Sequence, residues 1–200
     1  MMRLDNTGAF FKEIYKILAK LTIAGVFIGL FKSYDGWVAV VLLLKILHVL
    51  YTTIITSPSK NWMLLIGMIL SGAAGVIAEH WGVRNGYWEY HEVAQKLPLW
   101  LPFAWALAFY VLYKIEVGLI QHIKHKTTFN KVMIAFWVSL IVPALGEMIT
   151  IYLGVWTYYW EYQILGVPLL ALACLVTFHM SIYFVLAVLC RSLKIKDPVF

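Results

Sequence analysis

Residues 62–90 read WMLLIGMILSGAAGVIAEHWGVRNGYWEY, and this stretch decides the fold that we expect. Its first part, residues 62–83, is almost entirely apolar and matches the roughly 20 residues that a membrane-spanning helix needs. An acid, Glu79, lies inside the apolar run, and an aromatic loop follows it. The first element that the sequence predicts is therefore a helix in lipid, followed by a loop at the membrane interface.

The composition of the whole chain supports the same class. Hydrophobic residues make up 62% of the 200 residues and charged residues only 13%, and the mean hydropathy is +0.82. Soluble domains carry about 45–50% apolar and about 25% charged residues, so we exclude the soluble, fibrous and disordered classes. The net charge of +6 fits the basic loops of a membrane protein, and we expect no nucleic-acid partner.

We expect one all-α domain over residues 1–200, a polytopic membrane helix bundle of about six spans. Residues 8–31 are ambiguous, because Lys16 and Lys20 interrupt them, and they either cross the membrane or lie on its surface. Basic residues gather at the chain ends and in alternate loops. This bias predicts an integral protein of a bacterial or archaeal cytoplasmic membrane, with the N- and C-termini in the cytoplasm. The predicted spans are 14–31, 37–57, 62–83, 97–120, 132–153 and 167–190.

An internal repeat organises the chain after residue 61. Residues 82–90, GVRNGYWEY, and residues 154–162, GVWTYYWEY, are identical at six of nine positions at an offset of 72. Both segments leave one span and lead into another that opens with a proline, which predicts a parallel repeat of helical hairpins, spans 3–4 and 5–6. The predicted units are 62–131 and 132–200, and an N-terminal part, 1–61, carries spans 1–2.

Two acids lie inside predicted spans, where charge is costly and calls for an explanation. Counted from Gly82 and Gly154, which begin the repeated segments, Glu79 and Glu147 differ in depth by about one helical turn, or about 5–6 Å. One interpretation is a buried carboxylic acid that delivers a proton. The other is a structural pair with a basic side chain of another span: Lys45, His48 or His179.

The two repeated loops carry matched aromatic residues. Tryptophan and tyrosine collect at membrane interfaces in general, so an interfacial belt and a shared aromatic chamber mouth are alternative interpretations. The sequence has no metal-binding or nucleotide-binding signature, so we expect no metal and no cofactor. The candidate substrate-binding residues are Trp81, Tyr87, Trp88, Tyr90, Trp100, Trp105, Trp156, Tyr159, Trp160 and His179.

These residues resemble a known family. The pattern Glu79-x-x-Gly82-x-x-x-Gly86-Tyr87-x-x-Tyr90, followed by LPLWLPFAW at 97–105, resembles the first signature of the CruF-type carotenoid hydratases. These are bisanhydrobacterioruberin hydratase-like integral membrane proteins.

The second signature of that family, a tryptophan loop leading to Gly-Val-Pro-Leu, is similar to residues 154–169. Glu147 stands about where the family carries an aspartate, and the likeness covers roughly residues 72–182. The chain departs from the family at residues 96–99, which read KLPL in place of Gly-Val-Pro-Leu. Ala171, Ala173 and Cys174 replace an asparagine and a tryptophan.

The resemblance implies a lyase that adds water to a terminal C=C bond of a carotenoid or other isoprenoid. Acid catalysis of this kind needs a proton donor, aromatic faces that stabilise a carbocation, and a base that deprotonates water. Glu79 and Glu147 are the expected acid and base, in either order, and the lipophilic substrate enters from the bilayer lipids. The alternatives are an intramembrane terpene or lycopene-type cyclase and a non-catalytic lipid or isoprenoid carrier. Whether the chain forms a homo-oligomer is left open.

Overall fold

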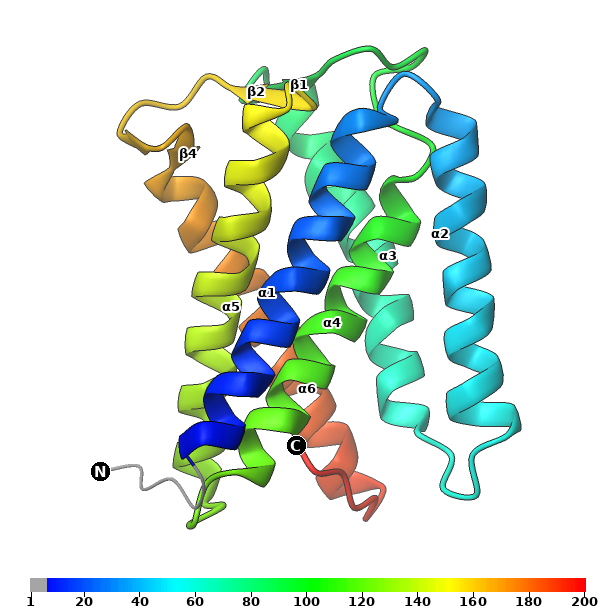
Figure 1. The fold of residues 1–200 in the computed structure, drawn as a ribbon, viewed down its shortest axis with the longest axis vertical. Coiled ribbons are helices and arrows are strands. Elements are labelled where there is room, and N and C mark those ends of the chain that lie inside the picture. The colour runs from blue at the N-terminus through cyan, green and yellow to red at the C-terminus, as the bar shows by residue number, and fades with distance from the viewer. Residues whose placement is uncertain (1–6) are drawn as a thin grey trace.

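The computed structural model describes residues 7–200 as a bundle of long helices (Figure 1). The helices are α1 Thr7–Leu30, α2 Asp35–Leu50, α3 Trp62–Arg84, α4 Leu101–Gln121, α5 Thr128–Tyr152 and α6 Leu169–Ser192, and a π-helical turn, η1 Tyr51–Ile55, continues α2. The short strands are β1 Trp88–Tyr90, β2 Trp156–Tyr158, β3 Gln163–Ile164 and β4 Val167–Pro168. The predicted all-α helical bundle is confirmed.

Five of the helices in the described part of the chain are long and apolar enough to cross a membrane. They are α2 with η1, α3, α4, α5 and α6. The remaining helix, α1, carries lysines in its first half, yet it runs beside α5 along the bundle (Figure 1). Close packing holds it there, because Gly25 and Gly29 bring its backbone against Ile149 of α5 and Leu153, the residue that follows α5. The segment predicted as ambiguous is therefore a helix of the bundle.

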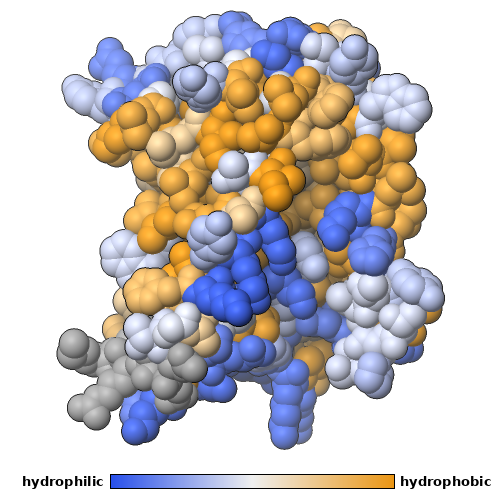
Figure 2. All heavy atoms as spheres, in the orientation of Figure 1, coloured by the Kyte–Doolittle hydropathy of each residue, from blue (hydrophilic) through white to orange (hydrophobic). Residues whose placement is uncertain are grey.

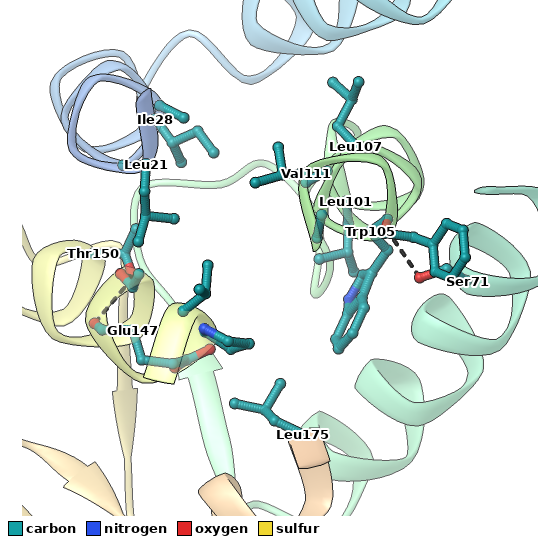
Figure 3. Close-up of a pocket in the computed structure, with 18 of the residues that line it drawn as sticks. Leu21, Ile28, Ser71, Leu101, Trp105, Leu107, Val111, Glu147, Thr150 and Leu175 are labelled. Carbon is teal, nitrogen blue, oxygen red and sulfur yellow. Dashed lines mark hydrogen bonds between the residues drawn. The ribbon is translucent and has the colours of Figure 1, made fainter. Parts of the chain in front are cut away.

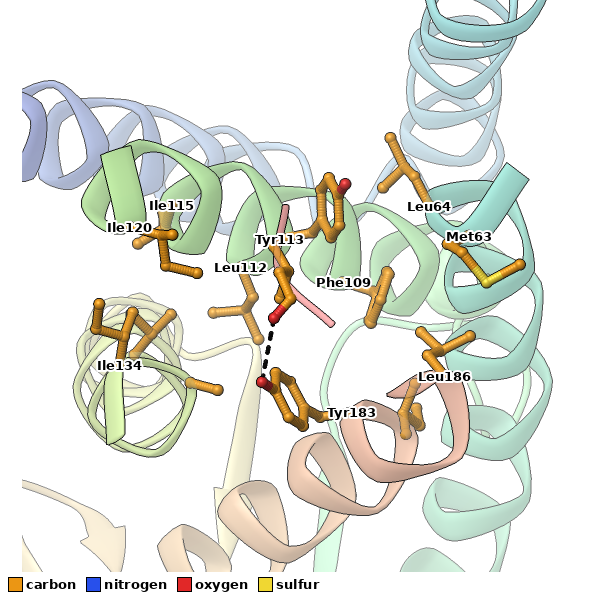
Figure 4. Close-up of a cluster of buried hydrophobic side chains, with 14 of the residues drawn as sticks. Met63, Leu64, Phe109, Leu112, Tyr113, Ile115, Ile120, Ile134, Tyr183 and Leu186 are labelled. Atoms are coloured by element: carbon orange, nitrogen blue, oxygen red, sulfur yellow. Dashed lines mark hydrogen bonds between the residues drawn. The ribbon is translucent and has the colours of Figure 1, made fainter. Parts of the chain in front are cut away.

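The chain enters and leaves the bundle at one end. Thr7 and the C-terminal residues lie at the lower end in Figure 1, and the long loops after α3 and α5 lie at the upper end. The lower end is closed by a core of large apolar side chains from α3, α4, α5 and α6 (Figure 4). The last residues complete this core, because Val199 is fully buried and the Tyr113 hydroxyl donates to Asp197 at 2.8 Å.

Small residues on α3 allow α4 to approach closely and place its aromatic side chains. A methyl group at Gly67 would overlap the Phe109 ring, and one at Gly75 would overlap the Trp105 ring. Between them, the Ser71 hydroxyl donates to the Trp105 carbonyl at 3.0 Å. Small residues at every fourth position are typical of tight helix contacts in membranes. The contact fixes the position of Trp105, which reaches the candidate site.

The turn between α1 and α2 holds the upper loops in place. Lys32 donates to the carbonyls of Leu153 and Gly154 at 3.0 and 2.9 Å, so a cation satisfies the carboxyl end of α5. The Asp35 carboxylate accepts the Leu99 backbone N–H with both oxygens, at 2.8 and 3.0 Å. The turn thus anchors both loops.

Several predicted span starts differ from the structure. The first span was expected from residue 14 and the fifth from residue 132, but α1 begins at Thr7 and α5 at Thr128. The fourth span was expected from residue 97, but α4 begins at Leu101, with Pro102 in its first turn. The sixth was expected from residue 167, but Val167 and Pro168 form β4 and α6 begins at Leu169. A proline lacks a backbone N–H, so it is tolerated where a helix begins, but it does not by itself say which residue is first.

Candidate functional site

Glu79 and Glu147 occupy matching positions in α3 and α5. Each lies five residues before the last residue of its helix and seven residues before a glycine with positive φ, Gly86 at 69° and Gly154 at 66°. Positive φ after a helix favours glycine, which has no Cβ to clash. Structurally equivalent residues of the two halves are therefore 68 residues apart. The similar sequence segments 82–90 and 154–162 are 72 residues apart, which is one helical turn more. The predicted difference in depth between the two acids is wrong.

The strands after these glycines pair with each other in the same register. Trp88 lies opposite Tyr158, and Tyr90 lies opposite Trp156, in an antiparallel ladder. Each pair joins the tryptophan of one loop to the tyrosine of the other, so the pairing has a local two-fold symmetry. The ring centroids of the pairs are both 5.5 Å apart. This small sheet brings the two loops together above the ends of α3 and α5 (Figure 1).

Each glutamate accepts hydrogen bonds from its own loop. Glu147 Oε2 accepts both the Trp156 indole N–H at 3.1 Å and the Tyr158 hydroxyl at 3.0 Å. Glu79 Oε2 accepts the Trp88 indole N–H at 2.8 Å. In both cases nine residues separate the acid from its tryptophan. The spacing Glu-x6-Gly-x-Trp-x-Tyr therefore describes one local structure that occurs twice.

The two acids differ in their second oxygen. Glu79 Oε1 accepts the Trp105 indole N–H at 3.2 Å, whereas Glu147 Oε1 receives no hydrogen bond from residues 7–200. At an offset of 68, the position of Trp105 is occupied by Ala173, which has no donor. Two indole donors stabilise a carboxylate at Glu79, while Glu147 has an oxygen that is free to carry a proton.

Both acids line a cavity of about 280 Å³ between the helices. Figure 3 shows its wall, with apolar side chains from α1, α4 and α6, such as Leu21, Val111 and Leu175, around Glu147. Trp100 is part of the same wall, and its buried indole N–H has no partner within the described chain. The predicted site residues that line the cavity are Glu79, Trp88, Tyr90, Trp100, Trp105, Glu147, Trp156 and His179.

The tyrosines of the two strands stay protonated. Burial raises the pKa of Tyr90 and Tyr158 well above the usual value of 10, and the Glu79 carboxylate adds to the rise at both. Both hydroxyls consequently remain donors throughout the physiological range. Tyr158 was not among the predicted site residues. The sequence did contain the signal, because Tyr158 follows Glu147 at the same spacing as Tyr90 follows Glu79.

Four predicted aromatic residues lie outside the cavity. Trp81 and Tyr159 are exposed, at 53% and 55%. The Tyr87 and Trp160 rings are in tilted contact, with centroids 5.2 Å apart, and the centroid of Trp160 also lies 5.4 Å from that of Trp88. These side chains form an outer layer over the paired strands.

The basic side chains that were expected to lock the acids do not do so. His179 pairs with Glu116 at 2.7 Å, and both are buried, at 4% and 1% exposure. Lys45 and His48 of α2 are exposed. Within residues 7–200, neither Glu79 nor Glu147 has a basic side chain within 4.0 Å. The predicted salt bridge from Glu79 or Glu147 to Lys45, His48 or His179 is therefore absent among the described residues.

Lys20 and Phe178 are examples of cavity residues that had no signal in the sequence. Lys20 lies in an amphipathic stretch, and its side chain reaches the cavity wall only because α1 packs beside α5. Phe178 packs on Trp105 with ring centroids 4.6 Å apart, through a contact between α6 and α4. In both cases the two helices in contact are far apart in the sequence.

The fold and site define a class: a helical membrane protein with an apolar cavity that holds two glutamates in matching positions. No group of three metal-ligating side chains occurs in residues 7–200. Comparisons with known protein families, curated proteins and solved structures find no match. The site must therefore be understood from its own chemistry.

Proposed function

We propose that this protein is a membrane-embedded enzyme that protonates a C=C bond of an isoprenoid and adds water to it. One observation carries the proposal: two carboxyl groups without a basic partner share one apolar cavity with aromatic walls. Charge inside a membrane protein without a counter-ion commonly marks function. Apolar surroundings suit a hydrocarbon chain, and the carboxyl pair supplies an acid and a base.

Glu147 is the proton donor in this proposal. Two ionised carboxylates in one apolar cavity would repel each other, so we assign one proton to the pair. Glu147 Oε1 is the place for it, since that oxygen accepts no hydrogen bond from the described residues. Transfer breaks the O–H bond of Glu147 and forms a C–H bond at the less substituted alkene carbon. The product is a tertiary carbocation facing a Glu147 carboxylate.

The aromatic wall then stabilises the carbocation. The rings of Trp88, Tyr90, Trp156 and Tyr158 belong to the paired strands and line the cavity. The negative face of an aromatic ring attracts a cation by about 0.5–2 kcal/mol, and neutral rings do not trap it covalently. Tyr90 and Tyr158 suit this role because they remain neutral phenols.

Water completes the reaction with Glu79 as base. The Trp100 indole N–H, which has no protein partner in the described chain, can donate to the attacking water. As the C–O bond forms, one proton of the water passes to Glu79, whose carboxylate is held by Trp88 and Trp105. The products are a tertiary alcohol and a proton on Glu79. Return of this proton to Glu147 restores the starting state.

The membrane topology is part of the proposal. The matching acids, glycines and strands support a parallel repeat in which α3–α4 and α5–α6 are equivalent hairpins. Basic loops at the end that holds the described termini support a cytoplasmic location for that end. With α1 as a sixth span, the substrate reaches the cavity laterally from the bilayer.

Product analysis tests the proposal. The chain is expressed in a host that makes acyclic carotenoids, and all isoprenoid lipids, apolar and polar, are separated and weighed by mass spectrometry. We expect a gain in mass of one water molecule per modified end, absent with Glu147→Gln. An unchanged mass at a shifted retention time indicates cyclisation, and no product with folded protein rejects catalysis.

One observation favours a second function, a non-catalytic carrier. Each carboxyl already accepts two hydrogen bonds from tryptophan or tyrosine, as a purely structural acid would. A carrier retains its ligand when Glu147 becomes Gln, since an amide oxygen still accepts the same two bonds. Lipid extraction of the purified variant, followed by mass spectrometry, separates this function from catalysis.

A further inference from the structure

A lysine lies at the centre of a predicted span without an acidic partner. Lys45 is the eleventh residue of the 21-residue span Asp35–Ile55. The described residues place no carboxylate within 4.0 Å of it. An isolated cation at this depth is costly, and such residues usually face a partner or a polar pathway.

The helix places Lys45 toward the bundle and not toward the lipid. Val38 and Val49 are buried, Leu42 lines the cavity, and Lys45 continues the same stripe at helical spacing. A residue on such a stripe is normally covered, yet Lys45 is exposed. Its ammonium group is therefore accessible to a ligand that lies along this stripe.

Two further lysines lie at a similar depth on the neighbouring helices. A Cβ at Gly118 of α4 would lie 3.0 Å from Glu13 of α1, and the two helices run in opposite directions. Counting seven residues forward from Glu13 in α1 and seven residues back from Gly118 in α4, Lys20 lies at the same level as Val111. Lys114 lies one turn from Val111 on the same face. Both Lys20 and Lys114 are exposed, and neither has a carboxylate within 4.0 Å among the described residues.

The cavity reaches this region. Its lining includes Lys20 of α1, Leu42 of α2, and Leu107 and Val111 of α4. From their common turn, α1 and α2 diverge toward the lower end, with α4 between them (Figure 1). Figure 2 shows hydrophilic side chains in the lower centre of this face, below a hydrophobic region. Lys20 thus belongs to the cavity wall, and Lys45 and Lys114 lie one helical turn beyond the lining residues Leu42 and Val111.

We propose that Lys20, Lys45 and Lys114 bind the phosphate head of an amphiphile whose apolar chain lies in the cavity. Charge complementarity carries the assignment, because Lys20 lines the cavity and Lys45 and Lys114 each lie one helical turn from a lining residue, Leu42 and Val111. Three lysines without an acidic partner among the described residues favour an anion, and the apolar wall favours a hydrocarbon chain. This inference rests on the proposed function at one point: the end of the hydrocarbon chain away from the phosphate is placed at Glu79 and Glu147. It narrows the isoprenoid substrate to one that carries a phosphate.

Ligand binding tests this without any turnover. Four tryptophans line the cavity, so their fluorescence reports on a chain that enters it. The purified protein in nanodiscs of phosphatidylcholine is titrated with farnesyl phosphate and with farnesol, its neutral counterpart. We expect the phosphate to bind at least about tenfold more tightly than the alcohol. Equal affinities for the two ligands overturn the inference, and this comparison needs no variant.

Variants locate the head group. Lys20→Gln, Lys45→Gln and Lys114→Gln should each weaken farnesyl phosphate about tenfold and leave farnesol unchanged. Lys60→Gln removes the same charge from an exposed loop and should change neither affinity. An unaltered preference for phosphate in all three lysine variants rejects the assignment.

The same measurements distinguish a membrane phospholipid from an isoprenyl phosphate as the source of the phosphate. They also test the proposed reaction and the phosphate site independently of each other. If membrane phospholipids supply the head group, phosphatidylglycerol in the nanodisc competes with farnesyl phosphate and weakens it. If a single-chain isoprenyl phosphate is the ligand, its affinity is the same in both bilayers. Tight phosphate-dependent binding with no hydrated product removes the proposed reaction alone. A hydrated product without any preference for phosphate removes this inference alone.

Discussion

At Glu147, one carboxyl oxygen accepts two hydrogen bonds, and the other accepts none from residues 7–200. At Glu79, both oxygens accept an indole N–H. The whole difference comes from Trp105, whose counterpart 68 residues later is Ala173. The hydrogen bonds thus favour a proton at Glu147 and a negative charge at Glu79, although the two acids otherwise occupy matching positions.

Substitution of the acids should separate their roles. Glu147→Gln removes the proton donor while an amide oxygen still accepts the Trp156 and Tyr158 bonds, so activity should fall by about 10²–10⁴ with little loss of stability. Product formation in membranes measures the first and thermal unfolding the second. Glu79→Gln should also lose hydration. Full activity in both variants would contradict the acid–base assignment.

The Trp100 side chain offers a second test at this scale. Its indole N–H has no acceptor in the described chain, so Trp100→Phe breaks no protein hydrogen bond, and the smaller buried ring should cost about 1–3 kcal/mol of stability. If it holds the attacking water, hydration should nevertheless fall about tenfold. Trp81→Phe, at an exposed position outside the cavity, is the matched control. Equal rates in the two variants would remove Trp100 from the mechanism.

At the scale of elements, the shape of α3 determines where the aromatic side chains lie. Its small residues receive the rings of α4 and of β1, and a methyl group at Gly82 would overlap the Trp88 ring. Trp88 in turn donates to Glu79. The geometry of an acid is therefore set by a glycine one turn away from it.

Gly82→Ala should displace the Trp88 ring and weaken its bond to Glu79. Overpacking of this kind costs about 1–3 kcal/mol, which thermal unfolding measures, and Trp88 fluorescence should shift as the ring moves. Gly36→Ala is the control, because its Cβ would meet nothing within 4 Å, and alanine favours a helix. Equal unfolding temperatures for the two variants would contradict the packing argument.

The loop contact between Glu92 and the α1–α2 turn should depend on pH. The Ser33 hydroxyl and Lys32 lower the pKa of Glu92 from its usual 4.5. A lowered pKa contributes stability above the unfolded value, and this contribution is lost as pH falls through the folded value. The unfolding temperature of the wild type should therefore exceed that of Glu92→Gln at pH 7. The difference should shrink as the pH falls below 4.5 and vanish once the pH is below the folded pKa of Glu92. A constant difference would contradict this origin.

At the scale of the whole molecule, the two loops meet across a local two-fold axis and cover one cavity. The opposing pairs in β1 and β2 place Glu89 directly opposite Thr157 at the centre of the ladder. Because the axis passes there, the loops remain equivalent only if this register holds. The cavity, the acids and the rings depend on that one pairing.

A disulfide tests the register. In a chain with Cys174 and Cys190 replaced by serine, cysteines at Glu89 and Thr157 should crosslink upon oxidation, since opposite residues of antiparallel strands lie about 4.5–5.5 Å apart. Mass spectrometry of the peptides detects the bond. Cysteines at Glu89 and Glu161, which the offset of 72 treats as equivalent, should crosslink far less. More crosslinking in the variant with Glu89→Cys and Glu161→Cys than in the variant with Glu89→Cys and Thr157→Cys would contradict the equivalence of residues 68 apart.

The sequence by itself determined the class of protein, the helices, the two acids and most of the aromatic wall. Apolar length and composition are local properties, so Trp62–Arg84 could be recognised as a span without knowledge of its neighbours. The acids were equally visible, because Glu79 and Glu147 interrupt apolar runs. The repeated letters did reveal two similar loops, but at the wrong offset.

Only the tertiary structure decided how these parts combine. The true offset depends on where each helix ends and how β1 pairs with β2, which are contacts between distant segments. The pairing of His179 with Glu116, and the place of Lys20 at the cavity, depend on which helices lie side by side. Which carboxyl oxygen is free depends on the direction of single hydrogen bonds. Periodicity along one chain carries no information about such directions, because packing between helices sets them.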